Sequence, residues 1–100
     1  MIDLNRQVKI LMRTGKFSFG ANEALEAAKS GRAKIIILTS NCPEPDRSDI
    51  MRYAGMSGVP TYASDVTSSD LGIICEKPYV VSALSVSEAG DSEILKLVVS

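Results

Sequence analysis

The sequence contains no histidine, and only two of its 100 residues are cysteines. Without histidine the chain lacks the general base of Ser-His and Cys-His hydrolases and the imidazole ligands of most zinc sites. Cys42 and Cys75 lie far apart and form no CxxC unit. Free thiols in a reducing compartment are therefore favoured over a single disulfide, which the spacing leaves open.

Long apolar runs are also missing. No run approaches the roughly 18 residues that a membrane span needs. The first six residues carry mixed charges, unlike a signal peptide. We therefore expect a cytoplasmic protein without membrane contact. Hydrophobic residues make up 45% of the chain and charged residues 23%, which suits one folded domain over residues 1–100.

The formal net charge is only -1, but it is unevenly distributed. Residues 1–34 hold seven basic and three acidic residues, a net charge of +4, and residues 35–100 hold four basic and nine acidic residues, a net charge of -5. A one-sided field of this kind permits phosphate contact at one end of the molecule. An ordinary mixed surface explains the same numbers equally well.

Hydrophobic periodicity and turn residues divide the chain into alternating helices and strands. Helices are expected from residue 4 to the stop at Thr14-Gly15 and over 21–30, 46–56, 68–74 and 92–98, and strands over 16–19, 33–40, 59–63 and 79–86. Asp3 is a candidate cap for the first helix, and Gly15 suits a left-handed position at its end. Thr67 and Asp70 resemble a capping box. The alternation implies a three-layer α/β/α sandwich around a four-stranded sheet of unknown strand order.

The first candidate site lies where strand 16–19 meets the next helix, at Gly20-Ala21-Asn22-Glu23. A helix start offers unpaired N–H groups to a phosphate or a base, and glycine allows a close approach. Asn22 can donate to and accept from a base edge, and Glu23 can accept from guanine N–H groups. Alternatively, both are ordinary first-turn residues that complement the helix dipole, which the motif alone favours.

Two further loops are candidate sites. The strand 33–40 contains the continuous apolar run 35–38, which is typical of a central strand covered on both faces. Asn41-Cys42-Pro43 follows this strand, at the strand end where ligands of open α/β sheets gather, although a proline-stiffened loop is as good an interpretation. In the segment 75–81, Tyr79 and Val80 lie close to Lys77. The ring suits stacking on a splayed base while the ammonium meets a phosphate. For an isolated tyrosine, a core position at a strand start is the favoured alternative.

Other kinds of site are not supported. Gly15-Lys16 suggests a phosphate loop, but the GxxxxGK[ST] pattern is absent. The acidic residues Glu44, Asp46 and Asp49 do not have the spacing of a calcium loop and fit a solvated helix start. No candidate nucleophile has a base beside it. We expect neither an enzyme nor a cofactor.

The chain carries a family resemblance over essentially its whole length, and three stretches are the most telling: TGKFSFGANEALEAAKSGRAKIIIL, SNCPEPDRSDIMRYAGMSGVPTY and DVTSSDLGIICEKPYVVSALSVSEAGDSEIL. The chain resembles the archaeal and eukaryotic large-subunit ribosomal protein thirty family, within the wider kink-turn-binding superfamily. The resemblance implies a mixed four-stranded sheet between helices, with RNA bound by loops at one end.

The resemblance also implies which residues bind RNA. It sets Gly20-Ala21-Asn22-Glu23 against the tandem sheared G·A pairs of a kink-turn, makes Tyr79 the stacking aromatic, and makes Lys16 and Arg47 phosphate neighbours. The full implied set is Lys16, Gly20, Ala21, Asn22, Glu23, Asn41, Pro43, Arg47, Lys77, Tyr79 and Val80. The chain departs from the pattern at Glu26, where guide-RNA-binding relatives carry lysine, and at Glu76, where glycine is common.

The expected function is that of a structural constituent of the large ribosomal subunit. Its partners would be ribosomal RNA and other large-subunit proteins, and in isolation it would be a monomer. A kink-turn protein of a small ribonucleoprotein particle is the alternative from the same superfamily. A small α/β enzyme or a signalling receiver domain is a third hypothesis, but the chain lacks the histidine, paired aspartates and phosphate loop that these classes use.

Overall fold

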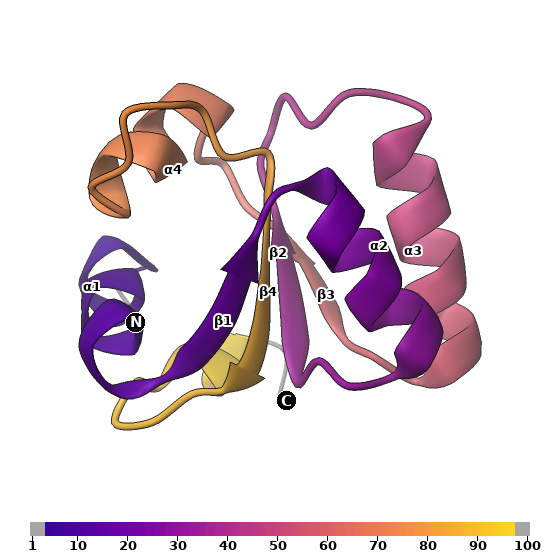
Figure 1. Cartoon of the computed structure of the whole chain (residues 1–100), viewed down its shortest axis with the longest axis horizontal. Helices are drawn as coiled ribbons and strands as arrows, with labels where there is room; N and C mark the ends of the chain where they lie inside the picture. Colours follow the sequence, from indigo (N-terminus) through magenta and orange to yellow (C-terminus); the bar gives the residue numbers. More distant parts are fainter. Residues whose placement is uncertain (1–3, 98–100) are drawn as a thin grey trace.

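The computed structural model describes residues 4–97, in which helices and strands alternate along the chain (Figure 1). The α-helices are α1 (Leu4–Thr14), α2 (Ala21–Ser30), α3 (Asp46–Ser57) and α4 (Ser68–Ile74), and a 3₁₀ helix, η1 (Ile94–Leu97), follows near the end. The strands are β1 (Lys16–Phe19), β2 (Ile35–Leu38), β3 (Thr61–Ala63) and β4 (Ala83–Glu88).

The four strands form one mixed sheet in the order β1-β4-β2-β3. β4 is antiparallel to both of its neighbours, and β2 is parallel to β3. Helices α1 and α4 cover one face of the sheet, and α2 and α3 cover the other (Figure 1). The predicted three-layer α/β/α sandwich is therefore confirmed, as is the mixed sheet that the resemblance implied.

The side chains of β2 supply both hydrophobic cores. Ile35 and Ile37 point into the core beneath α1 and α4, whereas Ile36 and Leu38 point into the core beneath α2 and α3. All four are fully buried. A continuous apolar run is typical of a strand covered on both faces, and each such side chain contributes about 1.5–3 kcal/mol on burial. The sheet is thereby a rigid base for its connecting loops.

Several predicted elements were wrong at their boundaries. The strands expected over 33–40 and 59–63 are the shorter β2 (Ile35–Leu38) and β3 (Thr61–Ala63). β4 begins at Ala83, not at residue 79, because its partners end there: Leu84 pairs with Phe19 and Ala83 pairs with Leu38. The helix expected over 92–98 is the short η1, and residue 98 lies outside the described residues. Ser92 Oγ donates to the Gln7 carbonyl at 2.9 Å and so ties the segment before η1 to α1.

The capping predicted at Thr67 is confirmed, whereas the left-handed position predicted at Gly15 is wrong. Gly31 and Gly58 are left-handed and end α2 and α3, and Thr67 Oγ1 accepts from the Asp70 N–H at 3.2 Å. Gly15 is not left-handed, contrary to the prediction. Glycine is required at this position because there is no room for a side chain: a Cβ would collide with the Glu88 carbonyl and a Leu11 methyl group. Asp3, the proposed first cap, lies outside the described residues.

No helix within residues 4–97 is long and apolar enough to cross a membrane. Cys42 and Cys75 are both buried and free, as predicted from their spacing. Burial raises the pKa of both thiols, that of Cys75 to about 11, and for Cys42 the Asp46 carboxylate adds to the effect. Neither thiol is therefore a ready nucleophile.

Candidate nucleic-acid interface

The three loops selected from the sequence meet at one end of the sandwich, the upper end in Figure 1. Two of these loops are held at this end by hydrogen bonds to the backbone at the start of β4. The Gly20 N–H donates to the Ala83 carbonyl at 2.9 Å, and Thr39 donates from both N–H and Oγ1 to the Ser82 carbonyl, at 3.1 and 3.0 Å. The β1–α2 and β2–α3 connections are thereby fixed to the α4–β4 connection.

The start of α2 is open to a ligand. Gly20 has φ 96° and ψ 157°, a conformation that favours glycine, and provides no side-chain cap to the helix. The first N–H groups of a helix have no partner within it. Asn22 and Glu23 are exposed in this first turn, and Ala21 is half-buried. The turn therefore presents N–H groups, an amide and a carboxylate to solvent together.

Asn41 lies at the same end, but its amide is already used within the protein. Its Oδ1 accepts from the Ser68 N–H at 2.8 Å, and its Nδ2 donates to Ser68 Oγ at 3.1 Å. The side chain therefore joins the β2–α3 loop to the first residue of α4. The structure gives Asn41 a positioning contact that the sequence did not suggest.

Pro43 and Arg47 complete the β2–α3 loop. Pro43 is exposed, and its carbonyl accepts from the Arg47 N–H at 3.0 Å. The Arg47 guanidinium donates to the Thr39 carbonyl at 3.1 Å. This hydrogen bond keeps the positive charge at the end of the molecule where the loops meet.

The α4–β4 loop displays apolar side chains to solvent. Tyr79 is 56% exposed and Val80 is 59% exposed. The interpretation of Tyr79 as a core tyrosine is therefore wrong. Lys77 Nζ lies 4.9 Å from the centroid of the Phe19 ring, a cation–π contact that directs the ammonium toward β1. An exposed ring beside a cation is a surface on which a nucleotide base can stack.

Sequence reasoning missed how two residues shape the backbone of this loop. Gly72, in α4, lies directly beneath it, because a Cβ at Gly72 would collide with the Tyr79 carbonyl. Glu76 has φ 58° and is the only non-glycine residue with positive φ in the described part of the chain. A glycine in the interior of a predicted helix was the available signal for Gly72. A left-handed backbone favours glycine, the residue that the family resemblance implies at the position of Glu76.

Lys16 is not brought to this end. It begins β1, three residues before Phe19, which places it about 10 Å down the strand. Its Nζ lies 3.9 Å from a carboxylate oxygen of Glu88. Its predicted contact with phosphate would have to be made by RNA that extends along the side of the sheet.

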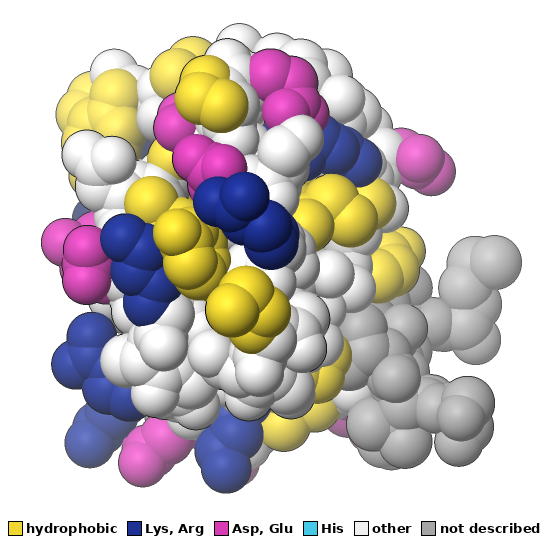
Figure 2. All heavy atoms as spheres, turned by 90° about the vertical axis from the view of Figure 1, so that its right-hand side faces the viewer, with side chains coloured by type: hydrophobic (Ala, Val, Ile, Leu, Met, Phe, Trp, Pro, Cys, Tyr) yellow, Lys and Arg dark blue, Asp and Glu magenta, His cyan; other side chains and the backbone are white. Residues whose placement is uncertain are grey.

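The outer face of α2 and α3 carries basic, acidic and hydrophobic side chains side by side (Figure 2). Lys29 Nζ and Arg52 Cζ lie 5.1 and 5.0 Å from the Tyr53 ring centroid. Arg52 also lies 3.5 Å from Asp49. The charge asymmetry of the sequence therefore does not make this face a uniformly basic surface.

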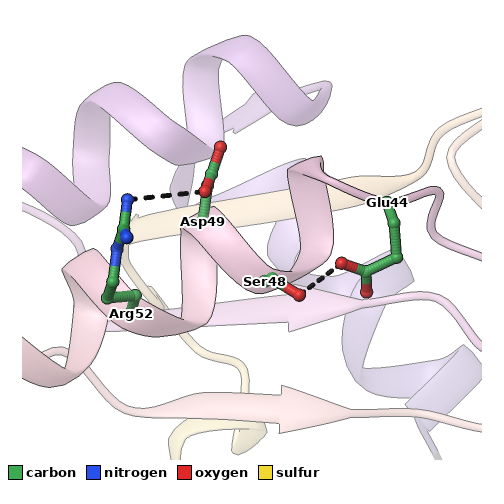
Figure 3. A network of polar contacts seen from close by, with 4 residues as sticks. All are labelled: Glu44, Ser48, Asp49 and Arg52. Carbon is green, nitrogen blue, oxygen red and sulfur yellow. Dashed lines mark hydrogen bonds and ion pairs between the residues drawn. The ribbon is translucent and has the colours of Figure 1, made fainter.

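The acidic residues near the start of α3 are engaged in contacts along the helix (Figure 3). Ser48 Oγ donates to the Glu44 carboxylate, and Asp49 pairs with Arg52. Among residues 4–97, no group of acidic or cysteine side chains has an arrangement suited to a metal ion. These carboxylates stabilise the first turns of α3, where negative charge is favourable.

Comparison with known proteins gives concordant matches along nearly the whole chain. The model of the Ribosomal protein L7Ae/L30e/S12e/Gadd45 family matches residues 2–96. Large ribosomal subunit protein eL30 of Methanothermobacter thermautotrophicus is 36% identical over 97 residues, covering 97% of this chain and 99% of that protein. The protein of the same name from Methanococcus vannielii is 40% identical over 96 residues, covering 96% and 91%. A solved structure of a protein with unknown function from Bacillus halodurans C has a TM-score of 0.71 at 18% identity, covering 92% of this chain and 89% of that one, and so shares the fold.

Proposed function

Because the chain belongs to the ribosomal protein L7Ae/L30e/S12e/Gadd45 family, we propose that it is a structural constituent of the large ribosomal subunit in the cytoplasm. It binds kink-turn-like ribosomal RNA through the loops at one end of the sandwich and contacts other large-subunit proteins. It acts as a monomer, without a cofactor and without catalysis. The near-full-length similarity to eL30 proteins supports the ribosomal assignment.

The observation that carries the RNA-binding proposal is the meeting of two different surfaces. The uncapped start of α2 presents Asn22 and Glu23, and the neighbouring loop presents Tyr79 and Val80. Hydrogen bonds to the Ser82 and Ala83 carbonyls hold the connections together. A bent RNA exposes base edges and unstacked bases at one place, so it can use both surfaces together.

Each residue type has a distinct task in this mechanism. Asn22 and Glu23 hydrogen-bond to the guanines of the sheared G·A pairs, while Gly20 lets the RNA approach the backbone. Tyr79 and Val80 pack against a flipped base. Lys77 and Arg47 supply positive charge to neighbouring phosphates, which makes the affinity fall as salt is added.

The alternative function is that of a kink-turn protein in a small ribonucleoprotein particle. Glu26 favours the ribosomal assignment, because the resemblance implies lysine at this position in the relatives that bind guide RNAs. Glu26 is exposed on α2, one helical turn beyond Asn22. Pull-down of RNA by the tagged protein distinguishes the two: large-subunit rRNA supports the proposal, and enrichment of guide RNAs supports the alternative.

The direct test is binding of the purified protein to a kink-turn RNA and to the same RNA with its G·A pairs replaced, each at two salt concentrations. We expect a clear preference for the intact motif. Asn22→Ala should remove about 1–3 kcal/mol of binding free energy. Asn5→Ala, which changes an exposed asparagine of α1 in the opposite helix layer, is the matched control. Equal affinity of the wild-type protein for both RNAs would refute direct kink-turn recognition.

A further inference from the structure

A polar groove extends from the start of α2 along the side of the sheet. It is lined by Ser18 of β1, Glu23 and Ala27 of α2, Arg32 beyond the end of α2, and Ser85 and Ser87 of β4. The groove exists because β1 is an edge strand and because the residue of β1 that lines it, Ser18, has a small side chain. Phe17 and Phe19 alternate with Ser18 and pack against the core on the other face.

The groove offers hydrogen-bond donors and one positive charge. Ser85 is 3% exposed, and its hydroxyl donates to the Ser18 carbonyl at 3.4 Å, so it forms the floor. Ser87 is exposed at the rim. Arg32 Nε donates to Ser30 Oγ at 2.9 Å, which orients the guanidinium. Within residues 4–97 the Arg32 guanidinium makes no ion pair, so its terminal NH₂ groups remain available to a ligand.

The groove has a negative charge at one end and a positive charge at the other, and these suit different parts of a nucleic-acid strand. Glu23 lies at the end next to the candidate interface, and Arg32 lies at the other end. From Glu23 to Ser30 the helix rises about 10 Å, a length that a short stretch of an RNA strand can span. A carboxylate accepts from a base but repels phosphate, whereas a guanidinium pairs with phosphate. A strand would therefore present a base edge at Glu23 and its backbone at Arg32.

We propose that this groove holds the sugar–phosphate backbone of one RNA stem strand next to the kink, with Arg32 contacting a phosphate. The exposed hydroxyl of Ser87 and that of Ser18 lie where they can hydrogen-bond to ribose or phosphate oxygens. This inference rests on the proposed kink-turn binding and extends it to a flanking stem. It also gives RNA a path along the side of the sheet.

The test measures how the affinity of Arg32→Ala for a kink-turn RNA varies with salt. Loss of one phosphate contact should reduce the slope of log affinity against log salt by about 0.7–0.9 and should weaken binding several-fold at low salt. Arg52→Ala, which removes another exposed arginine from the outer face of α3, should leave both values unchanged. Arg32→Lys should restore most of the slope. An unchanged unfolding midpoint shows that Arg32→Ala still folds.

Shortened RNAs identify the strand. Two RNAs, each with one of the two stems cut back close to the G·A pairs, are bound to the wild-type protein and to Arg32→Ala. The penalty of the substitution should disappear for one truncated RNA and persist for the other. A penalty that persists on both, or an unchanged salt slope on the intact RNA, would overturn the groove assignment. Failure of the wild-type protein to prefer the kink-turn would instead refute the proposed function itself.

Discussion

Two helical glycines allow a matched test of how α4 supports the α4–β4 loop. In Gly55→Ala the new Cβ meets nothing within 4 Å, whereas in Gly72→Ala it would collide with the Tyr79 carbonyl and lie 3.4 Å from the Val80 Cα. Both substitutions gain about 0.8–1.0 kcal/mol of helix propensity. Only Gly72→Ala adds an overpacking cost, about 1–3 kcal/mol. The difference in unfolding free energy between the two variants isolates that cost, because the helix contribution cancels.

Urea unfolding of the two variants provides the measurement, with the slope of free energy against urea checked for constancy. We expect Gly55→Ala to be more stable than wild type, and Gly72→Ala to be less stable than Gly55→Ala by about 1–3 kcal/mol. Because the displaced backbone carries Tyr79 and Val80, Gly72→Ala should also lose about 1–2 kcal/mol of RNA-binding free energy. Equal stabilisation of both variants with unchanged RNA affinity would refute the claim that Gly72 positions the loop.

Three other predictions concern the same end of the molecule. Tyr79→Ala should weaken RNA binding by about 1–3 kcal/mol but leave urea stability nearly unchanged, because the ring is 56% exposed; a stability loss without a binding loss would contradict this. Glu76→Gly should raise stability by about 1 kcal/mol by relieving a φ of 58°, and removing the negative charge should raise RNA affinity; lower stability in thermal unfolding would show that the residue is not strained. Alkylation of Cys75 in the folded protein should be very slow at pH 8 and should accelerate up to about pH 11, because a pKa raised to about 11 keeps the thiol protonated; a rate plateau near pH 9, measured by mass spectrometry, would contradict that pKa.

The alternation of helices and strands could be predicted because it depends on local patterns. The apolar run that became β2 predicted burial on both faces, and this was confirmed. The strand order could not be predicted, because the position of β4 between β1 and β2 depends on pairing between residues far apart in sequence. For the same reason the start of β4 was placed too early: the residues before Ala83 have β-favouring side chains, but no partner strand extends far enough to pair with them.

The site could be predicted as a set of loops but not as a set of contacts. The sequence shows that Asn41 follows a strand, yet not that its amide is bound on both sides by Ser68, 27 positions later. It shows Lys16 next to the first loop, yet the extended backbone of β1 carries that lysine away from the loop. Whether Tyr79 was buried or exposed depended on where its strand began, which tertiary pairing decides.

The position of β4 also determines when the interface can form during synthesis. Until the residues of β4 have been made, β1 has no strand to pair with, because its neighbour in the sheet is β4. Gly20 and Thr39 equally lack the Ala83 and Ser82 carbonyls that fix their loops. Ribosomes add about 5–20 residues per second, so a nascent chain spends seconds with the start of α2 translated but not held in place. Under the proposed function, capture of RNA by these loops is therefore delayed until the last strand has been inserted.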